Sequence, residues 1–174
     1  MSKVSREQID ADEKKVLQEL QKNSKESIDT IAKKCGFSRQ KVWRIIKRLE
    51  KNKTIWGYCA VVDNEQLDRK RYIMLIKRSS KPLGDTVNKI IDLTMHAKGK
   101  DTGVDVIDSS YLHGHYDWML IFTATDIKNA KRFREFLSME YHHAISDIHL
   151  LEDIFSVKKS NVVNPNVEKL RDLF

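Results

Sequence analysis

Residues 27–52 have the sequence SIDTIAKKCGFSRQKVWRIIKRLEKN, in which two short helical patterns are separated by a glycine. Ser27 and Ser38 are good N-caps, because a serine hydroxyl can accept a hydrogen bond from a free backbone N–H of the first helical turn. Behind each cap, apolar residues recur at i, i+3, i+4 and i+7, which is the spacing of one helical face. Gly36 fits the left-handed position that ends a helix. The stretch therefore predicts a helix-turn-helix.

A third helical pattern precedes this pair. Asp10 and Glu13 have the spacing of a capping box, in which each end of the motif satisfies a free backbone N–H. The apolar residues that follow on one face are Val16, Leu17 and Leu20. The sequence thus predicts a three-helix module whose first helix opens at Asp10 and ends near Asn23.

The outer side of the helix predicted from Ser38 to Asn52 is strongly basic. Glu50 is the only acid in this element, whereas a structural helix normally alternates charges of opposite sign at i and i+4. Such a face repels itself unless phosphates neutralise it, so DNA binding is favoured over a plain helical hairpin. The candidate DNA-binding residues are Ser38, Arg39, Gln40, Trp43, Arg44, Lys47, Arg48 and Lys51.

These candidates divide by their place along the helix. The N-terminal turns of a recognition helix reach base edges, where arginine can pair with guanine and glutamine with adenine. The residues assigned to base recognition are Arg39, Gln40, Trp43 and Arg44, and those assigned to phosphates are Lys47, Arg48 and Lys51. Trp43 has a second interpretation, since it borders the apolar stripe and can simply cover it.

The positive charge of the chain is concentrated at one end. Residues 1–60 hold 15 Lys and Arg against 8 Asp and Glu, whereas residues 61–174 hold 17 of each kind. A basic module joined to a neutral one indicates that the first meets a polyanion, although a solvated lysine surface is the alternative. We therefore expect double-stranded DNA as the partner of the first module and a different task for the second.

Other features of the sequence narrow the location of the protein. No run approaches the ~18 apolar residues of a membrane span, and the first 15 residues are too polar for a signal peptide. Cys35 and Cys59 provide no disulfide framework and fit the pattern of small buried hydrophobic residues. We expect a protein of the reducing cytoplasm that does not contact a membrane.

Three segments together resemble the Lrp/AsnC family of prokaryotic transcription regulators. They are IDADEKKVLQELQKN at 9–23, the stretch 27–52 and TIWGYCAVVD at 54–63. In that family the third helix runs into an Ile-x-Gly-Tyr strand, which the IWGY of residues 55–58 resembles. The family usually has a glycine just before this isoleucine. Residues 53–54 (KT) stand there instead, and Asn52 can supply the left-handed turn.

The rest of the chain alternates strand and helix patterns. The strand-like runs are Tyr72 to Ile76, Val104 to Leu112, Trp118 to Thr125 and Ile145 to Val157. A helical stripe with Leu83 and Ile90 follows the first run, and a helix that Asp126 can cap follows the third. The order β-α-β-β-α-β is that of a ferredoxin-like domain and resembles the effector-binding module of the family. Residues 96–103 (HAKGKDTG) are predicted to form a polar loop.

The predicted fold is therefore α+β, with an N-terminal winged helix-turn-helix domain followed by the ferredoxin-like domain. The expected boundaries are 1–60 for the DNA-binding domain, 61–70 for a linker strand or hinge, 71–157 for the effector-binding and oligomerisation domain, and 158–174 for a tail with a short helix. The tail can pack on its own chain or on a partner subunit, and the sequence does not decide between them.

The resemblance also implies how the second domain works. Related regulators form homodimers through it, often assembled into octamers, and bind a small effector, commonly an amino acid, near a Gly-x-x-Asp turn. The corresponding residues are Gly114, His115, Tyr116 and Asp117. Asp117 would hold an α-amino group and the N–H groups near Gly114 a carboxylate, but Gly and Asp are also the ordinary residues of a β-turn.

The sequence points to no catalytic residue, cofactor or metal. His113-x-His115 has no third ligand at the spacing of known zinc sites, and no nucleophile–base pairing or phosphate loop is present. Siroheme decarboxylases nevertheless resemble the same two-domain arrangement, so a tetrapyrrole enzyme is one alternative. Their turn carries a run resembling Arg-Asn-His-Asp-Tyr-Asn, unlike residues 114–117. A weakly specific architectural DNA-binding protein is another alternative.

Overall fold

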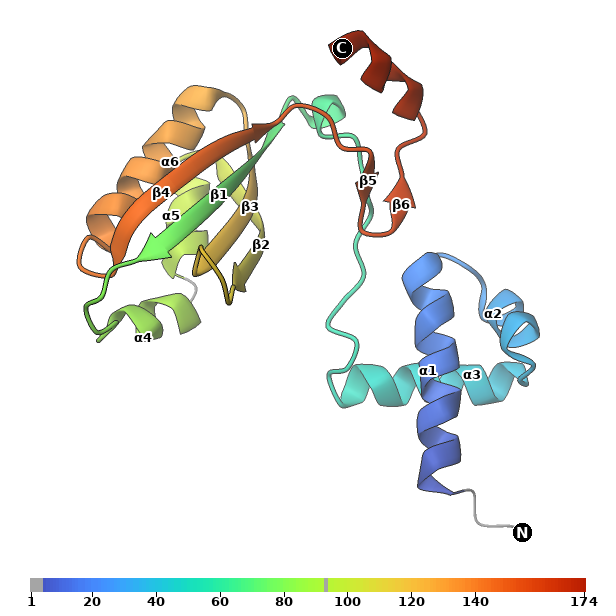
Figure 1. Cartoon of the computed structure of the whole chain (residues 1–174). Coiled ribbons are helices and arrows are strands. Elements are labelled where there is room, and N and C mark those ends of the chain that lie inside the picture. The colour runs from blue at the N-terminus through green and yellow to red at the C-terminus, as the bar shows by residue number, and fades with distance from the viewer. Residues whose placement is uncertain (1–4, 93) are drawn as a thin grey trace. The chain divides into compact units, whose positions relative to one another are not determined.

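The computed structural model describes residues 5–92 and 94–174, which form two units (Figure 1). One unit comprises Met1–Val61 together with Val157–Phe174, and the other comprises Val62–Ser156. The first contains helices α1 to α3, and the second a four-stranded antiparallel sheet with helices. This combination confirms the predicted α+β fold. Within the described residues, no helix is both long enough and apolar enough to cross a membrane.

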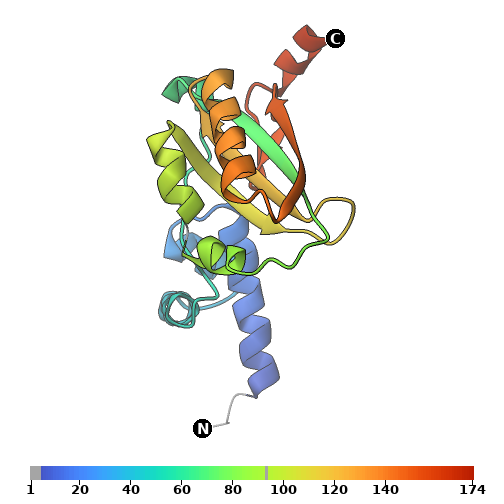
Figure 2. The same ribbon diagram turned by 90° about the vertical axis from the view of Figure 1, so that its left-hand side faces the viewer.

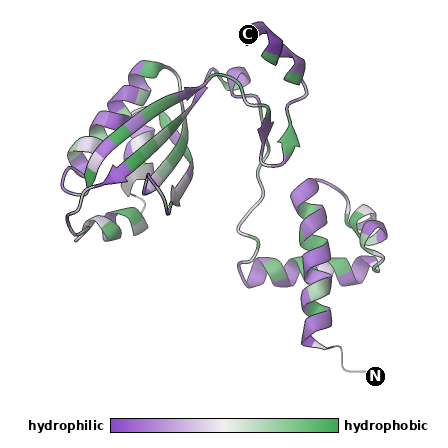
Figure 3. Cartoon of the chain, viewed as in Figure 1, coloured by the Kyte–Doolittle hydropathy of each residue, from purple (hydrophilic) through white to green (hydrophobic). Residues whose placement is uncertain are grey.

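The three helices of the first unit are built on local caps and an apolar stripe. They are α1 (Arg6–Lys22), α2 (Ile28–Cys35) and α3 (Arg39–Lys51). Ser27 Oγ accepts from Thr30 N at 3.1 Å and Ser38 Oγ accepts from Lys41 N at 3.3 Å, as predicted. Gly36 has a φ of 69°, which only glycine adopts without strain. The helices bury a common core of Val16, Ile31, Ala32, Val42, Ile45 and Leu49, and hydrophobic and hydrophilic residues alternate along α1 and α3 (Figure 3).

Two local predictions in this unit were wrong. Helix α1 begins at Arg6 rather than at Asp10, because Ser5 Oγ accepts from Gln8 N at 3.2 Å and caps the helix earlier. After α3, Lys53 rather than Asn52 takes the left-handed conformation, with φ values of 60° and −86° respectively. Asn52 still helps to close the turn, since its side-chain oxygen accepts from Thr54 N at 3.1 Å. In this described part of the chain, residues 56–63 are extended without forming a strand.

The sheet of the second unit has the predicted β-α-β-β-α-β order. Its strands are β1 (Lys70–Arg78), β2 (Val104–Tyr111), β3 (Trp118–Ala124) and β4 (Ile145–Asp153), arranged β2-β3-β1-β4. The 3-10 helix η1 (Asn64–Leu67) precedes β1, and the helices are α4 (Thr86–Ile91), α5 (Thr94–Asp101) and α6 (Ile127–Glu140). Helices α5 and α6 cover one face of the sheet (Figures 1 and 2).

Helix α5 replaces most of the polar loop predicted at residues 96–103. Gly99 lies in this helix, and a Cβ there would stand 3.3 Å from Val104 O and 3.6 Å from the Phe133 ring. Glycine thus lets α5 approach α6 and the start of β2 closely. The polar composition of residues 96–103 indicates a loop, whereas the close approach at Gly99 depends on a contact with Phe133, which is distant in the sequence.

The two faces of the sheet differ in what covers them. Side chains alternate along β1, so that Tyr72, Met74 and Ile76 are buried under the helices. Aromatic contacts extend this core, with the Phe122 and Phe133 rings 5.2 Å apart. The opposite side, here called the open sheet face, carries Ile73, Leu75, Met119, Ile121 and Leu151, which are paired across the strands. Leu151 is 46% exposed, so this face presents apolar side chains to solvent.

The C-terminal tail contains a small hairpin and a 3-10 helix. The hairpin joins β5 (Lys158–Lys159) to β6 (Val162–Val163), and η2 spans Val167–Leu173. Ser160 and Asn161 both have positive φ, as a tight two-residue hairpin turn requires. Asn161 Nδ2 donates to Gln21 O at 3.4 Å, while the Phe174 side chain is fully exposed.

Candidate nucleic-acid interface

Helix α3 turns its apolar stripe inward and its polar residues outward. Val42 is completely buried and Leu49 is 1% exposed, whereas Trp43 between them in sequence is 51% exposed. Trp43 therefore has about half of its surface free for an external contact. The polar residues opposite the stripe, here called the outer face of α3, are Gln40, Arg44, Lys47 and Lys51.

Several basic residues of α3 have carboxylate partners in the protein. Lys41 pairs with Asp12 and Arg48 with Glu13, each at 2.6 Å. Lys47 Nζ lies 2.8 Å from Glu50. Arg39 lies 3.6 Å from Asp29, with both side chains mostly exposed. The positive charge of α3 is therefore balanced in part by acids of α1, α2 and its own last turn, which the sequence pattern of one helix does not show.

The remaining positive charge of α3 is on its outer face. Within residues 5–92 and 94–174, Arg44 and Lys51 have no carboxylate within ion-pair distance. Arg44 Nε instead makes a long contact of 3.4 Å with Gln40 O in the preceding turn. Their charged groups are thus free to meet an external anion, and phosphate is the anion that a basic helix of this kind fits.

Asp12 is a residue of this module that the sequence analysis missed. It is 4% exposed, and its carboxylate accepts from Gln8 Nε2 at 3.0 Å as well as pairing with Lys41. The hydrogen bond from Lys41 lowers the pKa of Asp12 below its usual value. Asp12 lies one turn before Val16, on the face of α1 that enters the core. A charged residue at a core position of a helical pattern indicates an oppositely charged partner on another helix. The spacing of Asp12 and Val16 in the sequence could have indicated such a partner.

Comparison with known proteins agrees with this geometry. A family model described as a winged helix-turn-helix DNA-binding domain matches residues 10–55. The leucine-responsive regulatory protein of Haemophilus influenzae is 41% identical over 68 residues, which make up 39% of this chain and 41% of that protein. The chain thus matches about two-fifths of the length of this relative.

Solved structures extend the likeness to the fold of the whole chain. An AsnC family transcriptional regulator from Agrobacterium tumefaciens is 20% identical and has a TM-score of 0.63, over 90% of this chain and 94% of that one. LrpC of B. subtilis is 16% identical with a TM-score of 0.59, over 91% and 99%. A transcriptional regulator of Neisseria meningitidis, solved in complex with L-Met, is 18% identical with a TM-score of 0.62, over 94% and 98%.

The DNA-binding module of the chain is thus similar to that of an Lrp regulator, and its fold is similar to the folds of AsnC- and Lrp-type regulators. The resemblance stated from the sequence is thereby confirmed. The family model that matches residues 10–55 describes a DNA-binding domain, which agrees with the basic outer face of α3.

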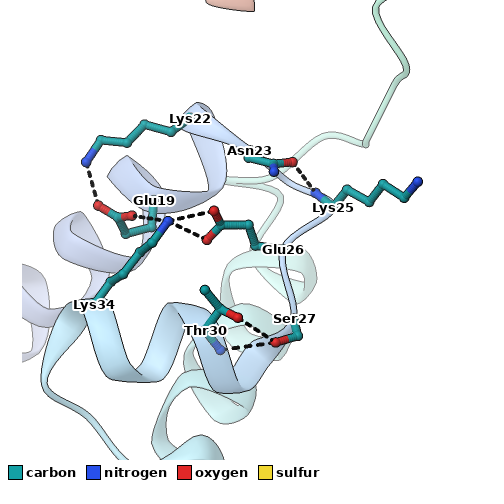
Figure 4. Close-up of polar contacts among 8 residues, drawn as sticks. All are labelled: Glu19, Lys22, Asn23, Lys25, Glu26, Ser27, Thr30 and Lys34. Carbon is teal, nitrogen blue, oxygen red and sulfur yellow. Dashed lines mark hydrogen bonds and ion pairs between the residues drawn. The ribbon is translucent and has the colours of Figure 1, made fainter.

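Ion pairs also join the first two helices of the helix-turn-helix module (Figure 4). Lys34 Nζ lies 2.6 and 2.7 Å from the two carboxylate oxygens of Glu26, and 3.7 Å from Glu19. Glu19 in turn accepts from Lys22 at 2.5 Å, which lowers the pKa of the Glu19 carboxyl. These contacts tie the C-terminal end of α1 to α2 and so help to hold the helix that precedes the turn.

Glu50 connects the end of α3 to the residues that leave the module. Its two oxygens receive hydrogen bonds from Lys47 at 2.8 Å and from the Tyr58 hydroxyl at 3.2 Å. The hydrogen bond from Lys47 lowers the pKa of Glu50, and burial raises the pKa of Tyr58. The single acid of α3 thus fixes the tyrosine of the Ile-x-Gly-Tyr segment against the helix.

The turn between β2 and β3 brings the predicted effector residues together. Asp117 Oδ2 accepts from Arg78 N at 2.8 Å, and Asp117 N donates to Ile76 O at 3.0 Å. The carbonyl of His115 accepts from Lys77 Nζ at 3.0 Å. The ring of Tyr116 lies edge-on to the rings of both His115 and His149. Asp117 therefore has a structural task at the end of β1, in addition to any contact with a ligand.

Histidine, cysteine and carboxylate side chains are the remaining groups that could form a metal or catalytic centre. Within the described ranges, no three His, Cys, Asp or Glu side chains gather in an arrangement that would hold a metal ion. Both cysteines are free thiols, and burial raises the pKa of Cys35, which makes its thiol less reactive at neutral pH. Cys59 is exposed rather than buried, contrary to the sequence-based expectation.

Proposed function

We propose that this protein is a sequence-specific transcription regulator that places α3 in the major groove of double-stranded DNA. The observation that supports the proposal is the outer face of α3, where Arg44 and Lys51 lack carboxylate partners in the described residues. The opposite side of the same helix is buried in the core of the module. A rigid helix with free cationic groups on one side can dock without paying to break internal ion pairs.

The roles of the α3 residues follow from their positions. Arg39, Gln40, Trp43 and Arg44 lie on its first two turns, from which side chains reach base edges. Lys47 and Lys51 lie further along and contact phosphates. Ser38 caps the helix, and its remaining acceptor and donor capacity suits a phosphate at the helix N-terminus. Arg48 is held by Glu13, so it reaches a phosphate only by leaving that partner.

Self-association through the open sheet face is the second part of the proposal. This face is apolar at its centre, while the charged residues Arg71 and Asp147 stand at its ends and His149 stands beside Leu75 on the edge strand β4. An apolar centre with a polar rim is typical of an interface between subunits. Pairing two copies by a twofold axis would cover both faces and present two α3 helices to half-sites about one helical turn of DNA apart. Assembly of such homodimers into octamers is a further expectation.

The third part of the proposal is control by a small effector at the β2–β3 turn. The backbone near Gly114 is exposed, and Asp117 has a second carboxylate oxygen beyond the one that accepts from Arg78. An amino acid offers the complementary groups, an ammonium for the carboxylate and a carboxylate for the N–H groups. We place the action of the protein in the cytoplasm, where free thiols such as Cys35 and Cys59 stay reduced.

Selection of binding sites from a random pool of duplex DNA tests this function. We expect the full-length protein to enrich a palindromic site with half-sites about 10 base pairs apart, and amino acids added one at a time to change the yield. Equal affinity for all sequences would instead identify an architectural DNA-binding protein. A purified protein that carries haem-like absorbance and binds no DNA would identify the tetrapyrrole enzyme.

A further inference from the structure

Asp12 is the only acid among the residues classed as buried in the described part of the chain. A carboxylate loses its hydration when it enters a core, so it persists there only with a cation and further hydrogen bonds. Asp12 has both, through Lys41 Nζ at 2.6 Å on one oxygen and Gln8 Nε2 at 3.0 Å on the other.

Lys41 is the third residue of α3, and it is held at both ends. Its backbone N–H donates to the capping hydroxyl of Ser38 at 3.3 Å. Its ammonium pairs with Asp12 and also stands 3.9 Å from the centre of the Phe37 ring, a favourable cation–π distance. Phe37 belongs to the turn between α2 and α3 and packs against the core of the module. One side chain thus joins α1, the turn and the first turn of α3.

We propose that Asp12, Lys41 and Phe37 position the first turn of the recognition helix, and that Lys41 does this in place of contacting DNA. The inference rests on the proposed function. Arg39 and Gln40 directly precede Lys41, so its fixed backbone sets where these two side chains leave the helix. Among the basic residues of α3, Lys41 is the one whose partner is buried, since the side chain of Asp12 is 6% exposed and that of Glu13 is 19% exposed.

Salt dependence separates positioning from phosphate contact. A lysine that neutralises one phosphate contributes about 0.9 to the slope of log affinity against log salt concentration, whereas a positioning residue contributes nothing to that slope. A positioning residue instead changes the ratio of affinities for target and random DNA, because base contacts require an accurate helix position. The two measurements therefore give opposite patterns for the two roles.

The experiment compares four variants of the full-length protein with the wild type. They are Lys41→Met, Asp12→Asn, the double variant with both changes, and the control Lys51→Met. Lys51 is matched because it lies on the same helix with no carboxylate partner in the described residues. Affinity for a selected target site and for random DNA is measured by titration at several salt concentrations, and folding of each variant is checked by thermal melting.

For Lys41→Met and for Asp12→Asn we expect an unchanged salt slope and a target-to-random ratio that falls roughly tenfold. The double variant should lose less than the two single losses combined, since it leaves no buried charge unpaired. This double variant also keeps the test valid if either single variant folds poorly. Lys51→Met should lower the slope by about one and leave the ratio nearly unchanged.

Two results would overturn the inference. One is a slope for Lys41→Met that falls as much as the slope for Lys51→Met, which would make Lys41 a phosphate contact. The other is a ratio of target to random affinity that stays at the wild-type value in all three Asp12 and Lys41 variants. The pair would then contribute to stability alone. Failure of the proposed function looks different, because the wild type itself would then bind DNA without discrimination or not at all.

Discussion

The outer face of α3 and the open sheet face are both exposed in this chain, yet they are exposed in opposite ways. The first carries charged and amide groups such as Arg44 and Gln40, which remain well solvated until an anion arrives. The second carries Ile73, Ile121 and Leu151, whose exposure to water costs free energy continuously. Under the proposed function, the open sheet face suits a permanent apolar partner, whereas α3 suits a partner that binds and leaves.

The acids around α3 sharpen this comparison. Asp12 and Glu13 of α1 neutralise Lys41 and Arg48 on the side of the helix that faces the protein. The positive charge that remains is therefore on the side that faces outward. The excess of basic residues in the first 60 positions indicates a polyanion partner. The placement of Asp12 and Glu13 leaves the unpaired positive charge of α3 on its outer face, where such a partner can bind.

The largest effect should come from a charge on the open sheet face. Ile73→Asp would place an unpaired carboxylate in the proposed interface, twice per dimer, and we expect it to cost at least about 3 kcal/mol of association free energy. Sedimentation should show monomers, and affinity for a two-half-site target should fall with them. Ile127→Asp is the control, because Ile127 is exposed at the start of α6 on the helix-covered side. A dimer that survives Ile73→Asp would remove the contrast between the two surfaces.

A change on the outer face of α3 should have the next largest effect. Arg44→Ala should remove about 1 to 3 kcal/mol of discrimination between target and random DNA, the usual value of a bidentate base contact. Titrations of both DNAs measure this loss, and melting should show an unchanged fold because Arg44 makes only a long contact with Gln40 O. Arg132→Ala, at an exposed arginine of α6, serves as the control. Unchanged discrimination would assign Arg44 to the phosphates or to solvent.

Asp117→Ala should have a smaller effect, on the stability of the second unit and on the response of DNA binding to the effector. Loss of the hydrogen bond from Arg78 N should lower the free energy of unfolding by about 1 kcal/mol. DNA binding without effector should stay intact, while the response to the amino acid that modulates the wild type should weaken. The control is Asp101→Ala at the exposed C-terminal end of α5. An identical response in the variant and the wild type would exclude Asp117 from the effector site.

The smallest effect concerns acid pH and the Asp12–Lys41 pair. The pKa of Asp12 is lowered from its usual value of 3.8, mainly by the hydrogen bond from Lys41. A lowered pKa in the folded state means that the pair stabilises the fold fully above pH 3.8 and loses this contribution as the pH falls through the folded-state pKa. The difference in Tm between wild type and Asp12→Asn should therefore be constant near neutral pH and shrink below pH 3.8. A difference that is independent of pH would show that the charge of Asp12 does not stabilise the fold.

Much of the fold could be predicted from the sequence because it depends on neighbours along the chain. The caps at Ser27 and Ser38 and the left-handed turn at Gly36 each involve backbone groups only a few residues away. The alternation along β1 follows from the same kind of local rule. Two of the predictions that were wrong, at the start of α1 and over α5, concern segments whose structure depends on a contact outside the stretch that was read. Ser5 extends α1, and the packing of Gly99 against Val104 and Phe133 stabilises α5.

A basic helix-turn-helix followed by a ferredoxin-like domain can be predicted from the residues alone, because periodicity, caps and charge are properties of short stretches. Which basic residues of α3 remain free depends on how the helices pack. Arg48 and Glu13 are 35 positions apart, and Asp117 and Arg78 are 39 apart. Such pairs form when helices or strands pack at a particular angle and register, and these depend on the whole core rather than on any one stretch of sequence.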